Sequence, residues 1–326
     1  MSLLFSLLFT IISYNCENLF DCRHDSLKND TEFLPTSQRH WTFTRYWEKL
    51  NNLGRVIQQC GSATTSLSEH GGTTTPAPGG ASLPDIAALL EVENDSTLFM
   101  LTRASLLKGA GYKYVMTDSP DARGIDIAIV YNPLTFRLLT SYAIRPQIDN
   151  LLTRDILYVK GVARARDTLH IFAVHAPSRR NGQGATEPLR MQVMRRLMQS
   201  VDSIRDTSPD AKIILLGDFN DYSHNKALKE ICKRGFTEVS RGIRGLNYDQ
   251  TKVKGTYKYQ GRWNSLDHIF LSDMVMGQVR RCFIYDAQWL LEEDAQGGYK
   301  PFRTYLGPIY HKGVSDHLPI VLQLEL

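Results

Sequence analysis

The segment at residues 212–221, with the sequence KIILLGDFND, constrains the fold of this chain more than any other stretch. Its four consecutive apolar residues follow a polar turn and are succeeded at once by Gly217, a pattern typical of a buried central strand that ends abruptly. Asp218 and Asn220 alternate around Phe219, so on an extended backbone both polar side chains share one face while the phenyl ring turns toward the core. We therefore predict a central strand that presents a carboxylate and an amide at its carboxyl end.

This Gly-Asp-x-Asn motif has two interpretations when it stands alone. It fits an Asx turn that merely leads the chain out of a strand. It also fits a functional site, because open sheets commonly place their chemistry at the carboxyl ends of strands. At such a site Asp can hold a metal or a histidine, and Asn can donate to a phosphate oxygen. The residues at the other predicted strand ends help to choose between these two interpretations.

Length and composition indicate a globular protein that can bury a full core. The 326 residues are 42% hydrophobic and 22% charged, which fits one large or two ordinary domains. The net charge of +4 at pH 7 is mildly basic, which permits a polyanionic partner without demanding one. The five cysteines form no CxxC pair and show no metal-ligand spacing, so we expect neither a disulfide framework nor a zinc site.

The first twelve residues are strongly apolar but contain no Lys or Arg, and the run is too short to span a bilayer. Two interpretations compete: the remnant of an export signal, or the first strand of the fold. We expect a strand from about Leu8 onward and leave residues 1–7 open between the two. The location is open in the same way, cytoplasmic or exported, and we expect no stable membrane insertion.

Hydrophobic spacing places the remaining elements. It predicts helices at residues 44–60, with Thr44 as the cap and Gly61 as the end, at 98–108 and at 189–204. Short apolar runs between turn signals predict further strands at residues 84–94, 112–116, 125–131, 136–143, 156–163, 169–175, 256–259, 265–271, 278–285 and 318–326. Residues 61–83 are rich in Ser, Thr, Gly and Pro, which predicts a flexible insertion within a single domain at 8–326.

Polar residues of compatible chemistry stand at six of these strand ends. The positions are Asn15, Glu91, His175, Asp218 with Asn220, Asp267, and Asp316 with His317. One such ending is unremarkable, but this many in one chain is more than solubility explains. The set therefore favours the functional interpretation of the Gly-Asp-x-Asn motif.

In these motifs the chain resembles the endonuclease/exonuclease/phosphatase superfamily, which has the fold of deoxyribonuclease I. The motifs occur in the family's order over nearly the whole chain: SYN at 13–15, LEV at 90–92, VHAP at 174–177, GDFN at 217–220, SLDH at 265–268 and SDHLP at 315–319. The longer stretches YNCENLFD at 14–21 and LLEVEN at 89–94 are similar in style to those of bacterial members described only as family hydrolases. The resemblance implies an α/β fold, a four-layer α/β/β/α sandwich with one active site at the carboxyl ends of the strands.

The resemblance also implies a metal site. Glu91 matches the glutamate that holds the catalytic divalent cation, and Asn15 and Asp316 lie beside it as supporting ligands or orienters. Such an all-oxygen set suits Mg²⁺ or Mn²⁺. Asp218 matches a residue that holds a second metal or, in another version of the mechanism, the attacking water.

A base and groups that contact the phosphate are implied as well. Asp267 matches the acid that hydrogen-bonds the catalytic histidine, His317, which takes a proton from water. Asn220 would bond a phosphoryl oxygen, and His175 matches the histidine that faces the phosphate and the leaving oxygen in deoxyribonuclease I and sphingomyelinases. AP endonucleases have Tyr-x-Pro-Asn where this chain has HAPS at 175–178, so abasic-site specificity is not implied.

Two arginines are candidates for substrate binding, each with a plainer alternative. Arg123 precedes a strand and either holds a phosphate or is simply solvated. Arg179 lies in a basic loop that either faces a polyanion or forms a solvated turn. We expect His268 to be a packed core histidine, and Glu93 to be a solvated or supporting acid on the face opposite Glu91.

The expected reaction is attack of water on a phosphoester, with the metal acting as a Lewis acid. The leading function is a monomeric, Mg²⁺-dependent phosphodiesterase or endonuclease that acts on nucleic acid. One alternative is a phosphatase or phospholipase C-type enzyme acting on inositol phosphates or sphingomyelin, for which residues 299–310 offer an apolar loop. The other is a catalytically silent member that uses the fold as a binding module.

Overall fold

The computed structural model describes residues 8–63, 83–148, 152–180 and 182–326. Residues 1–7, which the sequence leaves open between a signal remnant and the fold, lie outside these ranges. The predicted insertion at 61–83 also lies outside them, apart from residues 61–63 and 83. Among the described residues, no helix is both long enough and apolar enough to cross a membrane.

The first of two large sheets has six strands in the order β13-β18-β1-β2-β4-β3. β1 and β2 are parallel neighbours, and the other neighbouring pairs are antiparallel. The strands are β1 (Phe9–Leu19), β2 (Ile86–Val92), β3 (Lys113–Met116), β4 (Asp126–Tyr131), β13 (Val279–Ile284) and β18 (Ile320–Leu324). β1 and β2 lie at the centre of the sheet, and their apolar runs reflect burial on both faces.

The second sheet has six strands in the order β5-β6-β7-β8-β12-β9. The strands are β5 (Phe136–Ile144), β6 (Ile156–Ala163), β7 (Asp167–His175), β8 (Lys212–Asp218), β9 (Phe236–Glu238) and β12 (Asp267–Ser272). β8 runs parallel to β7 and antiparallel to β12, with a neighbour on each side. The prediction of a buried central strand at 213–218 is therefore confirmed.

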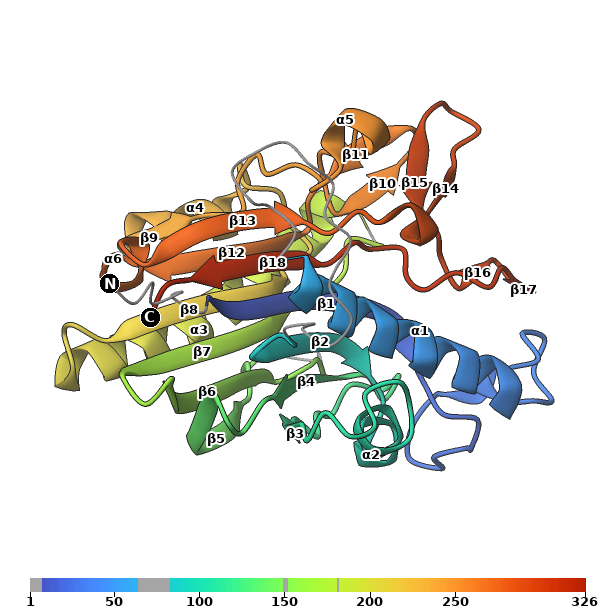
Figure 1. Cartoon of the computed structure of the whole chain (residues 1–326), viewed down its shortest axis with the longest axis horizontal. Helices are drawn as coiled ribbons and strands as arrows, with labels where there is room; N and C mark the ends of the chain where they lie inside the picture. The colour runs from blue at the N-terminus through green and yellow to red at the C-terminus, as the bar shows by residue number, and fades with distance from the viewer. Residues whose placement is uncertain (1–7, 64–82, 149–151, 181) are drawn as a thin grey trace, which may run out of the picture.

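Helices cover the outer faces of both sheets, which gives the four-layer α/β/β/α sandwich that the sequence predicts (Figure 1). α1 (Phe43–Ser62) and α2 (Asp95–Arg103) pack on the first sheet. α3 (Gln183–Thr207) and α4 (Lys226–Lys233) pack on the second. A third buried cluster joins the inner faces of the two sheets. The predicted fold class is confirmed.

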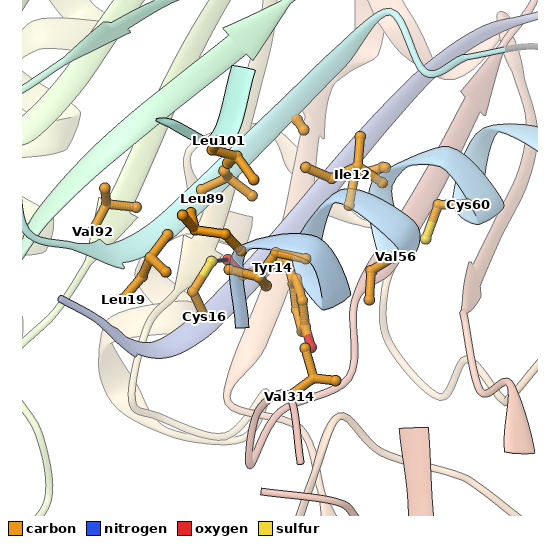
Figure 2. Packing of buried hydrophobic residues seen from close by; sticks show 14 of the residues in the cluster. Ile12, Tyr14, Cys16, Leu19, Val56, Cys60, Leu89, Val92, Leu101 and Val314 are labelled. Atoms are coloured by element: carbon orange, nitrogen blue, oxygen red, sulfur yellow. Dashed lines mark hydrogen bonds between the residues drawn. The ribbon is translucent and has the colours of Figure 1, made fainter. Parts of the chain in front are cut away.

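Successive side chains of β1 point alternately into two of these buried clusters. Ile12 and Tyr14 belong to the cluster that contains Val56 of α1, as Figure 2 shows. Phe9 and Ile11, on the opposite face of the strand, belong to the cluster between the sheets. Since successive strand residues point to opposite faces, an unbroken apolar run can serve both layers at once.

Shorter elements complete the fold, most of them between β8 and β18. They are η1 (Thr31–Phe33), α5 (Tyr248–Thr251), α6 (Asp273–Met276), η2 (Gln288–Leu290), and the hairpins β10 (Tyr257–Tyr259) with β11 (Arg262–Asn264), β14 (Leu291–Glu293) with β15 (Tyr299–Pro301), and β16 (Tyr305–Leu306) with β17 (Ile309–Tyr310). In Figure 1 the last two hairpins extend from the end of the sheets opposite the C-terminus.

The helix bounds differ from the predicted ones. α1 begins after Thr42 rather than at a Thr44 cap, and it continues through Gly61, which was expected to end it. α2 starts earlier than predicted, because the Asn94 side chain caps it by accepting a hydrogen bond from the backbone N–H of Thr97. It also ends earlier than predicted, at Arg103. α3 extends beyond the predicted helix at both ends.

The fold brings the polar strand ends to one edge of the paired sheets. β1, β2, β7 and β8 supply residues at or near their carboxyl ends. β12 and β18 are antiparallel to β8 and β1, so at this edge they begin rather than end. Asp267 starts β12 opposite Asp218, and His317 precedes β18. Asp316 precedes β18 as well, so the expectation that the whole site lies at carboxyl ends of strands is wrong for Asp267, Asp316 and His317.

Candidate active site

An open cleft at this edge has a volume of about 720 Å³, a polar floor, and walls that combine arginines with tyrosines. The residues expected from the sequence that line it are Asn15, Glu91, Arg123, His175, Arg179, Asp218, Asn220, Asp316 and His317. The remaining one, Asp267, is buried and bonded to His317. The fold thus brings every candidate residue to one place.

His317 and Asp267 form a buried hydrogen-bonded pair. Nδ1 of His317 is 2.7 Å from Oδ2 of Asp267, which also accepts a hydrogen bond of 2.6 Å from the Thr256 hydroxyl. Burial disfavours the imidazolium, but the surrounding carboxylates, Asp267 foremost, raise the pKa of His317 well above its usual value. Nε2 of His317 lies 4.0 Å from both Asp218 Oδ2 and Asp316 Oδ1, so the second ring nitrogen faces the floor of the cleft.

Asp218 lies between the two histidines of the cleft. Its Oδ2 accepts a hydrogen bond of 3.1 Å from Asn15 Nδ2 and lies 3.8 Å from Nε2 of His175 and 4.0 Å from Nε2 of His317. Burial and the nearby Asp267 carboxylate raise the pKa of Asp218 to about 7. The negative charge of this floor is therefore not fully balanced by the protein's own groups.

The second histidine, His175, is in the opposite electrostatic situation. Burial, followed by the positive charges of Arg154 and Arg123, lowers its pKa well below the usual value. Its Nε2 is 3.7 Å from Glu91 Oε1 and 3.8 Å from Asp218 Oδ2, too far for hydrogen bonds. Its Nδ1 has no hydrogen-bond partner within the described part of the chain. The neutral ring can therefore donate to or accept from a ligand.

Backbone irregularities direct Glu91 and Asn220 into the cleft. The pairing of β2 shifts register at Glu91 with both of its neighbours, the signature of a bulge that re-aims a side chain. Glu91 has a φ of 63° and Asn220 a φ of 49°, left-handed values that cost about 1 kcal/mol or more each in non-glycine residues. The Glu91 carboxylate accepts a hydrogen bond of 2.8 Å from the backbone N–H of Asn18, which fixes its position.

Lys49, Glu17 and Arg303 form a network beside the cleft that sequence reasoning missed. Arg303 donates a hydrogen bond of 2.5 Å to Asp316 and lies 3.6 Å from the Glu17 carboxylate. The buried Lys49 donates to the backbone oxygen of Glu17 at 2.6 Å and to the Thr304 hydroxyl at 2.7 Å. No local pattern points to this network, because Lys49 and Thr304 are 255 residues apart.

A buried ion pair positions the loop after β7 on another side of the cleft. Arg154 pairs with Asp121 at 2.9 Å and donates a hydrogen bond of 2.7 Å to the backbone oxygen of Ala176. The same oxygen accepts a hydrogen bond of 3.0 Å from Asn220 Nδ2, which leaves the other amide hydrogen for a ligand. Asp121 also lies 3.7 Å from Nε of Arg123, so it orients the candidate phosphate-binding arginine.

Two residues that the sequence sets apart from the site do lie outside the cleft. His268 is fully buried, with its ring nitrogens 2.8 Å from the Glu238 carboxylate and 2.9 Å from the Asp221 carbonyl, which confirms a core histidine. Glu93 accepts a hydrogen bond of 2.7 Å from the backbone N–H of Asp21. Because Glu93 is buried, the interpretation of a solvated acid is wrong.

The candidate membrane loop at 299–310 packs partly on the core. Tyr305 is buried and lies 5.8 Å from the ring of Trp41. Leu306 and Ile309 are 38% and 68% exposed. In this stretch only Leu306 and Ile309, paired with each other in the β16–β17 hairpin, are large apolar side chains exposed to solvent.

The donors of the cleft floor suit a hard divalent cation. Within the described ranges, one group of three acidic or histidine side chains has ligand atoms within 4.8 Å of one another: Asp218, Asp267 and His317. Asp267 is already bonded to His317, and the carboxylates that line the cleft are Glu17, Glu91, Asp218 and Asp316, of which Glu17 accepts a hydrogen bond from the backbone N–H of Thr304. Carboxylate oxygens match the preference of Mg²⁺ and Mn²⁺, and the raised pKa of Asp218 indicates that a positive charge would be stabilised there.

One protein-family model matches the chain over nearly its whole length. The model of the Endonuclease/Exonuclease/phosphatase family matches residues 10–326. Curated protein sequences contain no significant match to the chain.

Solved structures share the fold at low sequence identity. An endonuclease/exonuclease/phosphatase family protein from Bacteroides thetaiotaomicron superposes with a TM-score of 0.59 at 16% identity, over 97% of each chain. A mannosyl-6-phosphatase from the same organism gives 0.61 at 16% identity, over 98% of this chain and 100% of that one. The catalytic domain of human Nocturnin gives 0.56 at 15% identity, over 97% and 94%. At these identities the likeness shows the fold alone.

Proposed function

The chain belongs to the endonuclease/exonuclease/phosphatase family, and from this premise we propose that it is a Mg²⁺- or Mn²⁺-dependent phosphodiesterase that hydrolyses nucleic acid. The observation that carries the proposal is the buried His317–Asp267 pair, whose free ring nitrogen faces a floor of carboxylates in an open cleft. A base, a cation site and a route for substrate thus meet at one point.

His317 is the general base of the proposed reaction. Its Nε2 takes a proton from the attacking water, and Asp267 holds the tautomer with a proton on Nδ1 and stabilises the imidazolium that forms. Asp218, 4.0 Å from this nitrogen, orients the water or holds a second cation. The hydrogen bond from Thr256 keeps Asp267 in place.

Glu91 and Asp316, with Asn15 beside them, are the proposed ligands of the cation. When bound, the cation supplies Lewis acidity to a phosphoryl oxygen and offsets the negative charge of the transition state. Asn18 holds the Glu91 carboxylate and Arg303 holds that of Asp316. The protein therefore fixes both carboxylates through neighbouring groups that are not themselves proposed ligands of the cation.

The remaining candidates contact the phosphate. His175 faces the phosphate and the leaving oxygen as a neutral ring, which its lowered pKa supports. Asn220 donates its remaining amide hydrogen to a phosphoryl oxygen. Arg123 and Arg179 line the cleft and attract the substrate's negative charge.

Nucleic acid is favoured by the charge of the cleft walls. The arginines that line them are Arg39, Arg123, Arg179, Arg180 and Arg303. Such a lining suits a polyanion and predicts a steep salt dependence of binding. A phosphomonoesterase is the second candidate, because the fold is shared with a mannosyl-6-phosphatase and the cleft volume is that of a small-molecule pocket. A phospholipase C-type activity has only the exposed Leu306 and Ile309 in its favour.

The test is hydrolysis by the purified full chain with Mg²⁺, with and without EDTA. The substrates are supercoiled plasmid, a single-stranded oligonucleotide, mannose 6-phosphate, inositol phosphates and sphingomyelin. Metal-dependent cleavage of a nucleic acid is expected, with loss of at least about a thousandfold in His317→Ala. The matched control is His40→Asn, because His40 is exposed and has a left-handed φ of 48° that Asn tolerates.

The outcomes separate the candidates. Phosphate release from the small molecules with both nucleic acids intact would establish the phosphatase. Choline phosphate release from sphingomyelin would establish the phospholipase. Wild-type cleavage that His317→Ala retains would remove the proposed base, and no turnover of any substrate would leave the silent binding module.

A further inference from the structure

We propose that the cleft binds an unpaired nucleobase beside the scissile phosphate, stacked on a platform formed by Tyr222 and Arg179, and that single-stranded nucleic acid is therefore the preferred substrate. The inference rests on the proposed function, since it assigns a substrate class to the same cleft. Tyr222 plays no part as acid, base or metal ligand, so its position in the cleft wall calls for a separate explanation.

The two side chains of the platform already stack on each other. Cζ of Arg179 lies 4.1 Å from the centroid of the Tyr222 ring, and both residues line the cleft. Arg179 also donates a hydrogen bond to the side-chain oxygen of Gln183, a neutral group that leaves the guanidinium charge intact. The neighbouring acid Asp221 is paired at 3.1 Å with the buried Arg190. The platform thus presents a planar cation against an aromatic ring.

The turn that carries Tyr222 is fixed in place. The backbone N–H of Tyr222 donates a hydrogen bond of 2.9 Å to the side chain of Asn225, the buried residue before α4. The ring of His224 lies 5.6 Å from that of Tyr222 on the same turn. Asn220, the proposed ligand of a phosphoryl oxygen, precedes Tyr222 by only two positions. A substrate phosphate at Asn220 therefore has the platform as its neighbour.

Tyr257 lies in the same cleft as the platform, beside the proposed general base His317. Its ring centroid lies 5.1 Å from that of His317. Tyr222, Tyr257 and Tyr259 all line the cleft. A nucleobase on the platform would therefore lie in the same cleft as the phosphate that His317 serves.

A platform of this kind discriminates between classes of substrate. In a duplex the base faces are covered by their neighbours, whereas an unpaired base can stack on aromatic rings and on the guanidinium plane. The cleft volume of about 720 Å³ lies within the range of ligand pockets, about 300–1,000 Å³. It can take in a short piece of one strand but cannot enclose a double helix. A puckered sugar ring would gain less stacking energy from the two flat surfaces of the platform than a planar nucleobase does.

Two variants test the platform with the full chain and Mg²⁺. Tyr222→Leu keeps apolar volume but removes the ring, and Arg179→Lys keeps the charge but removes the plane. Both are assayed on a single-stranded oligonucleotide, on a strand of equal length and charge with abasic sites around the cleaved bond, and on a duplex. We expect Tyr222→Leu to lose about tenfold in kcat/KM on the strand with bases and to stay within about twofold on the abasic strand, and we expect Arg179→Lys to lose more on the strand with bases than on the abasic strand.

A binding measurement and a control variant complete the test. In a His317→Ala background, the same substitutions should weaken binding of the single strand, followed by fluorescence anisotropy, more than binding of the abasic strand. Tyr142→Leu, at a half-exposed tyrosine of β5 that does not line the cleft, should change neither readout.

Equal losses on both strands, no loss on either, or preference for duplex would overturn the platform while His317-dependent cleavage leaves the proposed function standing. Hydrolysis of mannose 6-phosphate or inositol phosphates with every strand intact would overturn both, since the substrate class itself would then be wrong.

Discussion

At the scale of single residues, the chemistry depends on two buried histidines whose pKa values move in opposite directions. The carboxylates of Asp267, Asp316 and Asp218 outweigh burial at His317 and raise its pKa. At His175 burial and two arginines lower the pKa. Opposite pKa shifts of this kind indicate that the two histidines have different roles in the reaction. His317 has the higher proton affinity that a base needs, and His175 stays neutral beside the phosphate.

The pH dependence of the reaction follows from the raised pKa of His317. A base must be unprotonated, so kcat/KM should rise with pH and its acid limb should lie above the usual range of an imidazole. In Asp267→Asn the limb should move to lower pH by about one unit or more, because the largest stabilising charge is gone. The rate plateau should also fall at least about a hundredfold, because the tautomer is no longer fixed. A pH–rate series with saturating Mg²⁺ measures both, and an unmoved limb would assign it to another group.

Glu93 gives a prediction about stability rather than activity. Burial, with the nearby charges of Asp21, Asp30 and Asp25, raises the pKa of Glu93 from the unfolded value of 4.5 to about 8. The folded state therefore holds a proton that the unfolded chain has released, so this stabilisation is complete below pH 4.5 and is lost as the pH rises toward 8. Glu93→Gln should accordingly gain up to about 4 kcal/mol over wild type between pH 5 and pH 8.5.

Urea unfolding at the two pH values measures this difference. Glu293→Gln, at an exposed carboxylate on β14, controls for the loss of one negative charge. The same pH dependence in Glu93→Gln and wild type would show that Glu93 does not carry the proton.

At the scale of elements, the distance between β7 and β8 at the site depends on one glycine. Gly217 has a φ of 132°, and a Cβ there would lie 2.0 Å from the backbone oxygen of Val174 on β7. His175 and Asp218 are the register partners that come next along these strands. Any side chain at 217 would therefore push the strands apart where the cleft floor forms.

Gly217→Ala should destabilise the protein by about 3 kcal/mol and abolish activity. Chemical denaturation and the plasmid assay measure the two effects. Gly277→Ala is the matched control, because Gly277 has a φ of −64° and its Cβ would meet nothing within 4 Å. If both variants were equally stable, the close approach of β7 and β8 would not constrain the fold.

Elements were predictable from the sequence where a local signal exists. The apolar run before Gly217 and the polar residues after it locate β8 and its site residues, because strand burial and strand termination are encoded in neighbouring residues. The bulge that turns Glu91 into the cleft has no such signal, since it arises from pairing with two other strands. The contacts of Lys49 and Arg303 were equally invisible, because their partners are far away in the sequence or known only from the fold.

At the scale of the whole molecule, the cleft floor is a product of both sheets. Glu91 comes from β2 of the first sheet and Asp218 from β8 of the second. Asp316 precedes β18 of the first sheet. The two sheets otherwise meet through an apolar cluster, which imposes no charge constraint. Carboxylates from opposite sheets repel one another across this seam, so a cation bound between them should stabilise the packing of the sheets as well as the reaction.

This arrangement predicts that Mg²⁺ or Mn²⁺ raises the thermal stability of the full chain. A cation that binds only the folded state at about 100 times its Kd adds about 2.7 kcal/mol, which corresponds to a rise in Tm of several degrees for a chain of this size. EDTA should reverse the rise. Glu91→Gln should lose most of this metal-induced rise in Tm, because the amide keeps the shape of the side chain but removes its charge. Without metal, the Tm of Glu91→Gln should be no lower than that of wild type, since one repelling carboxylate is gone. Scanning calorimetry with and without metal measures all three values, with Glu293→Gln as the control for a distant charge. If Glu91→Gln kept the full rise in Tm, the cation would be bound elsewhere, and Glu91 would have to act on the substrate directly.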